Sequence, residues 1–132
     1  MRRNVWGWSA GALLLASVSF EGCFLVAAGA GAGAAVAYTN RGAKSVVDGS
    51  VDQVFERSIG VFQQLGITET GRGVEDSGAK RRLVGAKGET EVTVELTRES
   101  ATTTHVEVVA KTNPVDYDTD FAKTVLTRIV QK

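Results

Sequence analysis

Cysteine and histidine, the side chains most often used in nucleophilic and metal chemistry, each occur once in this 132-residue chain, as Cys23 and His105. A protein metal site needs several nitrogen, sulfur or carboxylate ligands that converge on the ion. The predicted strand that holds His105 offers only Glu107 on the same outward face, which is too few. We therefore predict no catalytic residue, no metal site and no cofactor, and we interpret His105 as a solvated surface residue.

Three aspartates alternate near the C-terminal end, at Asp116, Asp118 and Asp120. Alternating carboxylates are typical of oxygen-ligand calcium loops, but the EF-hand loop also needs glycine at its sixth position and glutamate at its twelfth. Counted from Asp116, those positions hold Phe121 and Thr127. We interpret the aspartates as solvated residues that cap a helix.

The densest basic stretch is Lys80-Arg81-Arg82, with Lys87 nearby. It has two interpretations: a solvated edge strand whose charges prevent edge-to-edge pairing, or a contact with phosphate or lipid headgroups near a membrane. The formal net charge is zero, and no aromatic side chains interleave with these cations. We therefore predict that the chain does not bind nucleic acid.

The N-terminal part has the layout of an export signal. Arg2 and Arg3 precede an apolar run over residues 5–20, which is shorter than the ~20 residues of a membrane-spanning helix. The small residue Gly22 then stands directly before Cys23. A single cysteine forms no internal disulfide, so its position asks for another explanation. We predict a signal peptide over residues 1–22, cleavage between Gly22 and Cys23, and lipidation of Cys23.

These residues resemble the lipobox of bacterial lipoproteins, in which an apolar residue, two small residues and cysteine follow one another. Phe20, Gly22 and Cys23 fit that pattern, while Glu21 departs from it because its position is normally small and uncharged. The resemblance implies a bacterial cell-envelope location. Residue 24 is Phe rather than the Asp that retains many such proteins in the inner membrane, which favours the outer membrane, facing the periplasm.

An uncharged glycine- and alanine-rich tract follows, and we assign residues 23–40 to the acylated cysteine and its tether. Gly29 and Gly33 lie one helical turn apart, so the tract could also pack against another helix. If the signal is not cleaved, residues 5–38 could instead span the membrane, interrupted near Glu21 at a free-energy cost of roughly 2.5–3.5 kcal/mol.

Residues 41–132 carry the patterns of one small α+β domain. Apolar residues at helical spacing after a Ser50–Gln53 capping box predict a helix over 51–65, ended by Gly66. A second helix is expected over about 118–131, with Asp118 as its N-cap. Alternating apolar residues predict the strands. We expect the order β-α-β-β-β-β-α, in an antiparallel sheet of four to five strands with two helices on one face; the predicted strands are 43–47, 67–76, 79–87, 91–97 and 104–108.

The whole layout resembles a family of small bacterial lipoproteins known as domain of unknown function 3568. The resemblance rests on Gly22-Cys23, the tract 27–37, the helix that begins at Ser50, and the segments 92–96 and 104–106. It implies an α+β fold and an envelope location, and it implies no activity.

We therefore expect a lipid-anchored envelope lipoprotein whose domain is non-enzymatic and serves a structural or interaction role. Its partners would be the membrane, through the acyl anchor, and an envelope protein. One alternative is the uncleaved, membrane-inserted chain. Another is a domain that binds a small ligand or a lipid in the groove between helices and sheet. The sequence predicts no oligomeric state.

Overall fold

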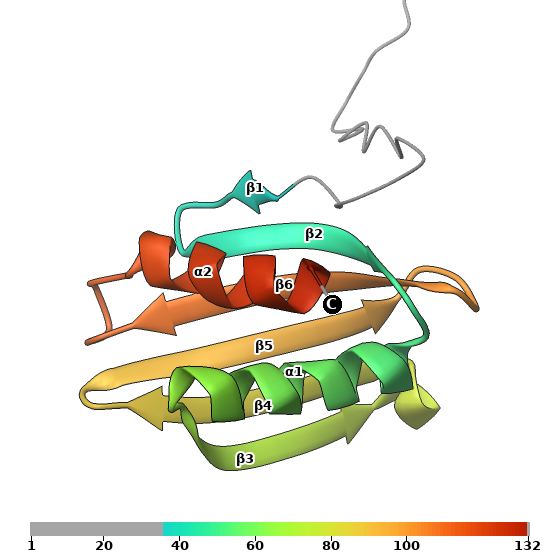
Figure 1. Cartoon of the computed structure of the whole chain (residues 1–132), viewed down its shortest axis with the longest axis horizontal. Helices are drawn as coiled ribbons and strands as arrows, with labels where there is room; N and C mark the ends of the chain where they lie inside the picture. Colours follow the sequence, from blue (N-terminus) through green and yellow to red (C-terminus); the bar gives the residue numbers. More distant parts are fainter. Residues whose placement is uncertain (1–35, 132) are drawn as a thin grey trace, which may run out of the picture.

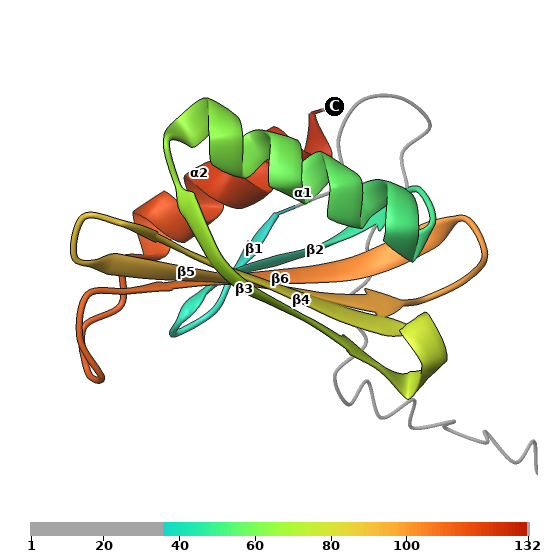
Figure 2. The same cartoon turned by 90° about the horizontal axis from the view of Figure 1, so that it is seen from below.

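The computed structural model describes residues 36–131 of the chain. The predicted signal peptide, the cleavage site at Gly22 and Cys23, and most of the predicted tether lie outside these residues. The described part is a single layer of sheet covered on one side by two helices, as Figure 1 and Figure 2 show from two directions. This arrangement confirms the predicted α+β class with both helices on one face.

The sheet contains six strands in the order β1-β2-β6-β5-β4-β3, and all neighbouring pairs are antiparallel. The chain from β3 to β6 is a meander, whereas β2 returns to pair with β6 at the far side (Figure 1). A 3₁₀ turn, η1 (Asp76–Gly78), joins β3 to β4. The strands are β1 Ala37–Tyr38, β2 Gly42–Asp48, β3 Thr68–Glu75, β4 Lys80–Lys87, β5 Thr90–Arg98 and β6 Thr103–Lys111.

Helix α1 (Val51–Leu65) has the predicted bounds, and both of its predicted caps are present. The Ser50 hydroxyl accepts a hydrogen bond from the Gln53 backbone N–H at 3.3 Å, and the Gln53 side chain accepts one from the Ser50 N–H at 3.0 Å. Gly66 ends the helix in the left-handed conformation, with φ of 69°, which favours glycine. Local sequence signals therefore determine both ends of this helix.

Helix α2 (Thr119–Val130) also begins where the sequence predicts. The Asp118 carboxylate accepts a hydrogen bond from the Phe121 backbone N–H at 2.9 Å, so the capping interpretation of this aspartate is confirmed. The two helices lie side by side on the sheet, with α1 over the β3–β5 half and α2 over β2 and β6 (Figure 1).

The core lies between the helices and the sheet. Phe55 and Phe62 of α1 and Leu126 and Ile129 of α2 meet the inward side chains of the strands there. The alternating apolar residues of β5 and β6 are all fully buried: Val92, Val94, Leu96, Val106, Val108 and Ala110. Period-two alternation therefore identifies the helix-covered face of β5 and β6.

Strand β1 is the element that the sequence does not predict. It comprises only Ala37 and Tyr38, which pair with Lys44 and Ala43 of β2, and it lies in the stretch assigned to the tether. Two residues in a glycine- and alanine-rich tract give no alternation to detect. The sheet therefore has six strands, where four to five were predicted.

The β3–β4 register shifts between Glu69 and Gly71, which marks a bulge or irregularity in β3. Among the described residues, no helix has the length and apolar character that crossing a membrane requires.

Candidate functional site

The face of the sheet without helices brings together the strand side chains that the sequence predicts to point outward. His105 lies there on β6, half-buried between Val46 of β2 and Thr97 of β5 in register. Within residues 36–131, no group of three or more His, Cys, Asp or Glu side chains is placed to hold a metal ion.

A row of charges crosses this face next to His105. It runs over four strands in register: Lys44, Glu107, Glu95 and Arg82. Arg82 is 2.7 Å from Glu95, which makes a direct ion pair. Glu95 and Glu107 are directly opposite on neighbouring strands, an arrangement of like charges that destabilises a sheet unless cations flank it. Arg82 flanks the two carboxylates through its ion pair with Glu95, and Lys44 stands opposite Glu107 at the other end without an ion pair to any described residue.

The predicted basic patch does not exist as one surface. Strand alternation places Lys80 and Arg82 on the helix-free face and Arg81 on the helix face. The edge-strand interpretation is wrong, because β4 lies between β3 and β5. The edge strands are β1 and β3, which the linear sequence of charges does not reveal.

Each of the three consecutive cations has its own carboxylate. Lys80 is 3.4 Å from Asp76, and Arg82 is paired with Glu95. The third pair joins Arg81 to Asp52 in the first turn of α1, at 2.7 Å. The charge of this stretch is therefore largely neutralised inside the molecule.

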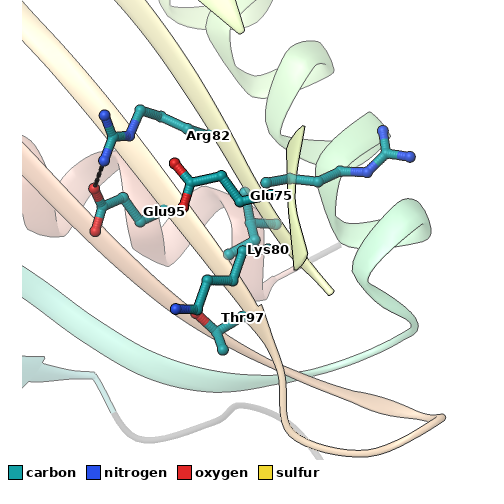
Figure 3. A pocket seen from close by; sticks show the side chains of 7 residues that line it. Glu75, Lys80, Arg82, Glu95 and Thr97 are labelled. Carbon is teal, nitrogen blue, oxygen red and sulfur yellow. Dashed lines mark hydrogen bonds and ion pairs between the residues drawn. The ribbon is translucent and has the colours of Figure 1, made fainter. Parts of the chain in front are cut away.

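A hollow of about 240 Å³ lies beside this stretch. Figure 3 shows the Arg82–Glu95 ion pair on one side, Lys80 and Thr97 on the other side, and Glu75 between them. The hollow thus contains two cations and two carboxylates on the helix-free face. Arg82 and Glu95 compensate each other and Lys80 pairs with Asp76, so Glu75 is the one lining charge without an ion pair to a described residue, and a single carboxylate offers too few oxygen ligands for a cation site.

On the helix face, two guanidinium groups cover the ring of Phe55. The Arg81 guanidinium lies 4.9 Å from the ring centre and that of Arg72 lies 5.6 Å from it. Arg72 also makes a two-pronged pair with Glu69, at 2.6 and 2.8 Å. The hydrogen bond from Arg72 holds the pKa of the Glu69 carboxyl below its usual value. Arg72 and Arg81 therefore cover the Phe55 ring of α1 and are paired with carboxylates, so they do not form a free binding surface.

The three aspartates have separate structural tasks. Asp118 caps α2, and Asp120 lies in the first turn of that helix. Asp116 accepts a hydrogen bond from the Asn113 side-chain amide, and its own backbone N–H donates to the Asn113 side chain at 2.9 Å. The spacing that suggested a calcium loop thus belongs to a turn and a helix start.

The side of the molecule formed by β1, β2 and α2 holds cations that the sequence does not reveal as a group. We name this surface the anchor-side rim and define it as Tyr38, Arg41, Lys44, Lys123 and Arg128. These residues come from β1, the β1–β2 turn, β2 and α2. None of the four cations forms an ion pair with any described residue.

Aromatic rings take the place of carboxylates at this rim. The Lys123 ammonium lies 4.6 Å from the centre of the Tyr38 ring, and the Arg41 guanidinium lies 5.9 Å from that of Tyr117. Tyr38 is 54% exposed, although it is a large side chain. An open groove of about 540 Å³ runs along the outer side of α2; it is lined by Tyr38, Lys123 and Arg128, together with Asp120, Thr124, Thr127 and Gln131.

The order of charges along the sequence hides the rim. Its cations are spread from Arg41 to Arg128 in the sequence, and they lie at the same edge of the sheet only because α2 packs over β2. The sequence reveals the consecutive cations Lys80-Arg81-Arg82, but it does not reveal the anchor-side rim, whose cations are far apart in the chain. The signal that could have found it is the shortage of carboxylates around these particular residues, and that requires the topology.

A family described as protein of unknown function (DUF3568) matches residues 9–125 of the chain. The match covers most of the sequence. The chain belongs to this family. No curated protein matches the chain.

The DUF3568 match extends beyond the folded domain. It begins at Ser9, so it includes part of the apolar run and Cys23 as well as the domain up to Val125 in α2. Both the N-terminal segment and the α+β domain therefore belong to the region that the chain shares with the family.

Proposed function

We propose that the chain is an envelope lipoprotein, anchored through acylated Cys23 and facing the periplasm from the outer membrane, whose domain is a non-catalytic structural or interaction module. Residues 1–22 act as the signal peptide in this proposal, and Gly22 and Cys23 flank the cleavage point. The described residues begin at Val36, so the domain over residues 41–132 would be held close to the membrane surface by a short connection.

The observation that carries the proposal is the position of Cys23. It is the only cysteine, and it follows two arginines, a short apolar run and the small residue Gly22. Only 12 residues separate it from Val36, where the described domain begins. The family match spans this junction, which supports a shared role for the segment and the domain.

Acylation would supply an anchor that needs no help from the domain. Each buried methylene of an acyl chain contributes about 0.8 kcal/mol, so two or three chains hold a protein effectively permanently. The surface of the domain then remains available for contacts with an envelope partner.

The two alternatives have less support. Ala37 and Tyr38, at the end of the segment proposed to span the membrane, form β1 and pair with β2. Large core side chains fill the space between the helices and the sheet, among them Phe55, Phe62 and Leu126. Neither alternative has a specific observation in its favour.

Intact mass measurement of the chain extracted from membranes tests the proposal. We expect loss of residues 1–22 and the added mass of a diacyl or triacyl modification on Cys23. Cys23→Ala should leave an unmodified chain that is no longer retained by the membrane. Gly22→Ala is the matched control, because alanine is also small and should leave processing intact. A full-length, unmodified wild-type chain in the membrane would contradict the proposal.

A further inference from the structure

The anchor-side rim combines unpaired cations with an exposed aromatic residue at the end of the domain where the described chain begins. β1 is the first strand, and Tyr38 lies on it with Lys123 of α2 stacked against its ring. We propose that this rim docks on the anionic phospholipid headgroups of the membrane, and so sets the orientation of the domain on the bilayer. The inference rests on the proposed lipid anchor at Cys23.

The length of chain before the domain limits how far the rim can be from the bilayer. The 12 residues between Cys23 and Val36 span at most roughly 45 Å when fully extended. The part of the domain nearest the attachment point is therefore β1 with its neighbours β2 and α2.

The charges of the rim suit an anionic surface. Arg41, Lys44, Lys123 and Arg128 form no ion pair with described residues. The carboxylates nearby are Asp120, which lines the same groove, Glu107, which is opposite Lys44 on β6, and Asp116 and Asp118, which flank Tyr117. None of them forms an ion pair with a rim cation, and unpaired lysine and arginine near a membrane surface are attracted to anionic lipids within about a Debye length.

Tyr38 adds a contact of a different kind. Its side chain is 54% exposed. Tyrosine is favoured at the level of lipid headgroups, because its ring is apolar and its hydroxyl is polar. The stacked ammonium of Lys123 would keep its positive charge beside the phosphate groups while Tyr38 contacts the upper part of the acyl chains.

The other side of the domain lacks this combination. Arg72 of β3 and Lys80, Arg81 and Arg82 of β4 are paired with carboxylates of the same domain, whereas Lys87 of β4 has no ion pair among the described residues and lies 5.6 Å from the centre of the half-buried Phe121 ring. A lipid phosphate would have to compete with those carboxylates. The asymmetry predicts a single preferred orientation, with the rim toward the bilayer and the β3 edge away from it.

The test uses the full chain, extracted with its acyl group and reconstituted into phosphatidylcholine vesicles with or without phosphatidylglycerol. A spin label is placed on Thr124→Cys, an exposed position in the groove, or on Thr70→Cys, an exposed position on β3. Relaxation of each label by a paramagnetic chelate attached to lipid headgroups reports its closeness to the surface. We expect strong relaxation at residue 124 with phosphatidylglycerol and weak relaxation at residue 70.

Removing two cations should then abolish the orientation. Lys123→Gln with Arg128→Gln is expected to lower the ratio of docked to undocked domain by roughly tenfold or more. Lys80→Gln with Arg98→Gln changes the net charge equally, but on β4 and β5, neither of which neighbours β1 or β2. This control should leave the relaxation at residue 124 unchanged.

Three results would overturn the inference: equal relaxation at the two positions, no dependence on phosphatidylglycerol, or an equal loss with the control pair. Immobilisation of the label at residue 124 without headgroup contact would show that a second copy of the chain occupies the rim instead. Failure of the anchor itself is distinguishable, because the chain would then lack the acyl mass and expose a free Cys23 thiol. In that case both the proposed lipid anchor and the orientation inferred from it are wrong.

Discussion

The two sides of this small sheet differ in how they treat their cations. On the β3–β4 side, Arg72, Arg81 and Arg82 each have a carboxylate within 2.7 Å. On the β1–α2 side, Lys123 and Arg41 stack on tyrosine rings and have no carboxylate partner among the described residues. The first set of cations is neutralised by carboxylates of the same domain, and the second set remains available to anions outside it.

This contrast teaches that cation density along the chain is a poor guide to a binding surface. The sequence Lys80-Arg81-Arg82 is conspicuous, but strand alternation sends its members to opposite faces and carboxylates neutralise them. The rim is assembled from four separated cations. What makes a basic surface available is the absence of internal partners, which is a property of the fold.

The largest effect is expected at a glycine next to the rim. A methyl group on Gly42 would lie 1.9 Å from the Val108 carbonyl oxygen of β6. Because that atom belongs to the backbone, β2 must move, and Gly42→Ala should lower the free energy of unfolding by at least about 3 kcal/mol. Urea denaturation measures this change.

Gly71→Ala on the β3 edge is the matched control. Nothing lies within 4 Å of the added methyl group there, and alanine should even gain about 0.5–1 kcal/mol in a strand. Equal destabilisation by the two substitutions would show that β2 is not held against β6 as closely as the structure has it.

The next largest effect compares the two kinds of stacked cation. The Arg81 side chain is 26% exposed, covers Phe55 and pairs with Asp52. Arg81→Ala should cost about 2 kcal/mol of unfolding free energy, whereas Lys123→Ala beside the exposed Tyr38 should cost about 0.5 kcal/mol.

Asp52→Asn separates the ion pair of Arg81 from its stacking. It removes the carboxylate charge and leaves the guanidinium over the ring, so it should cost less than Arg81→Ala. If Lys123→Ala proves as costly as Arg81→Ala, the rim contributes to folding and is not a surface kept for external contacts.

Much of the domain follows from local patterns. Ser50, Gln53 and Gly66 define α1, Asp118 starts α2, and the alternation of β5 and β6 identifies their buried sides. These signals are read from neighbouring residues, and each has a direct physical cause.

The features that sequence analysis missed depend on contacts between distant segments. β1 is too short to show a pattern, and the position of β3 at the edge depends on how the meander joins β2. The rim requires α2 to lie over β2 before Lys123 can reach Tyr38. The pairing of strands and the packing of α2 therefore determine which cations have a carboxylate partner. The order of the residues along the sequence does not show this.

A smaller effect compares the caps of the two helices. Asp118→Ala removes the N-cap of α2, and Ser50→Ala removes one half of the capping box of α1. Each should cost about 1 kcal/mol. Amide hydrogen exchange should show that the first substitution loosens the start of α2 next to the rim, while the second leaves α2 unchanged.

Asp118→Asn is the control for charge, because asparagine caps a helix about as well as aspartate. It should retain most of the protection of α2. If instead it behaves like Asp118→Ala, the negative charge at the helix start matters more than the hydrogen bond to Phe121.

The smallest effect distinguishes the two sides by their response to acid. The hydrogen bond from Arg72 lowers the pKa of Glu69 from its usual 4.5, so the pair stabilises the fold fully above that value. The contribution is lost as the pH falls through the lowered pKa of the folded state. Glu69→Gln should therefore lower the urea midpoint slightly at about pH 6, and the difference from the wild type should vanish at about pH 3. Lys123→Gln should shift the urea midpoint equally at both pH values. Its contact is with the Tyr38 ring, and it forms no ion pair with a described carboxylate that acid could protonate. An acid-dependent effect of Lys123→Gln would reveal a carboxylate partner in solution, and the contrast between paired and unpaired cations would no longer hold.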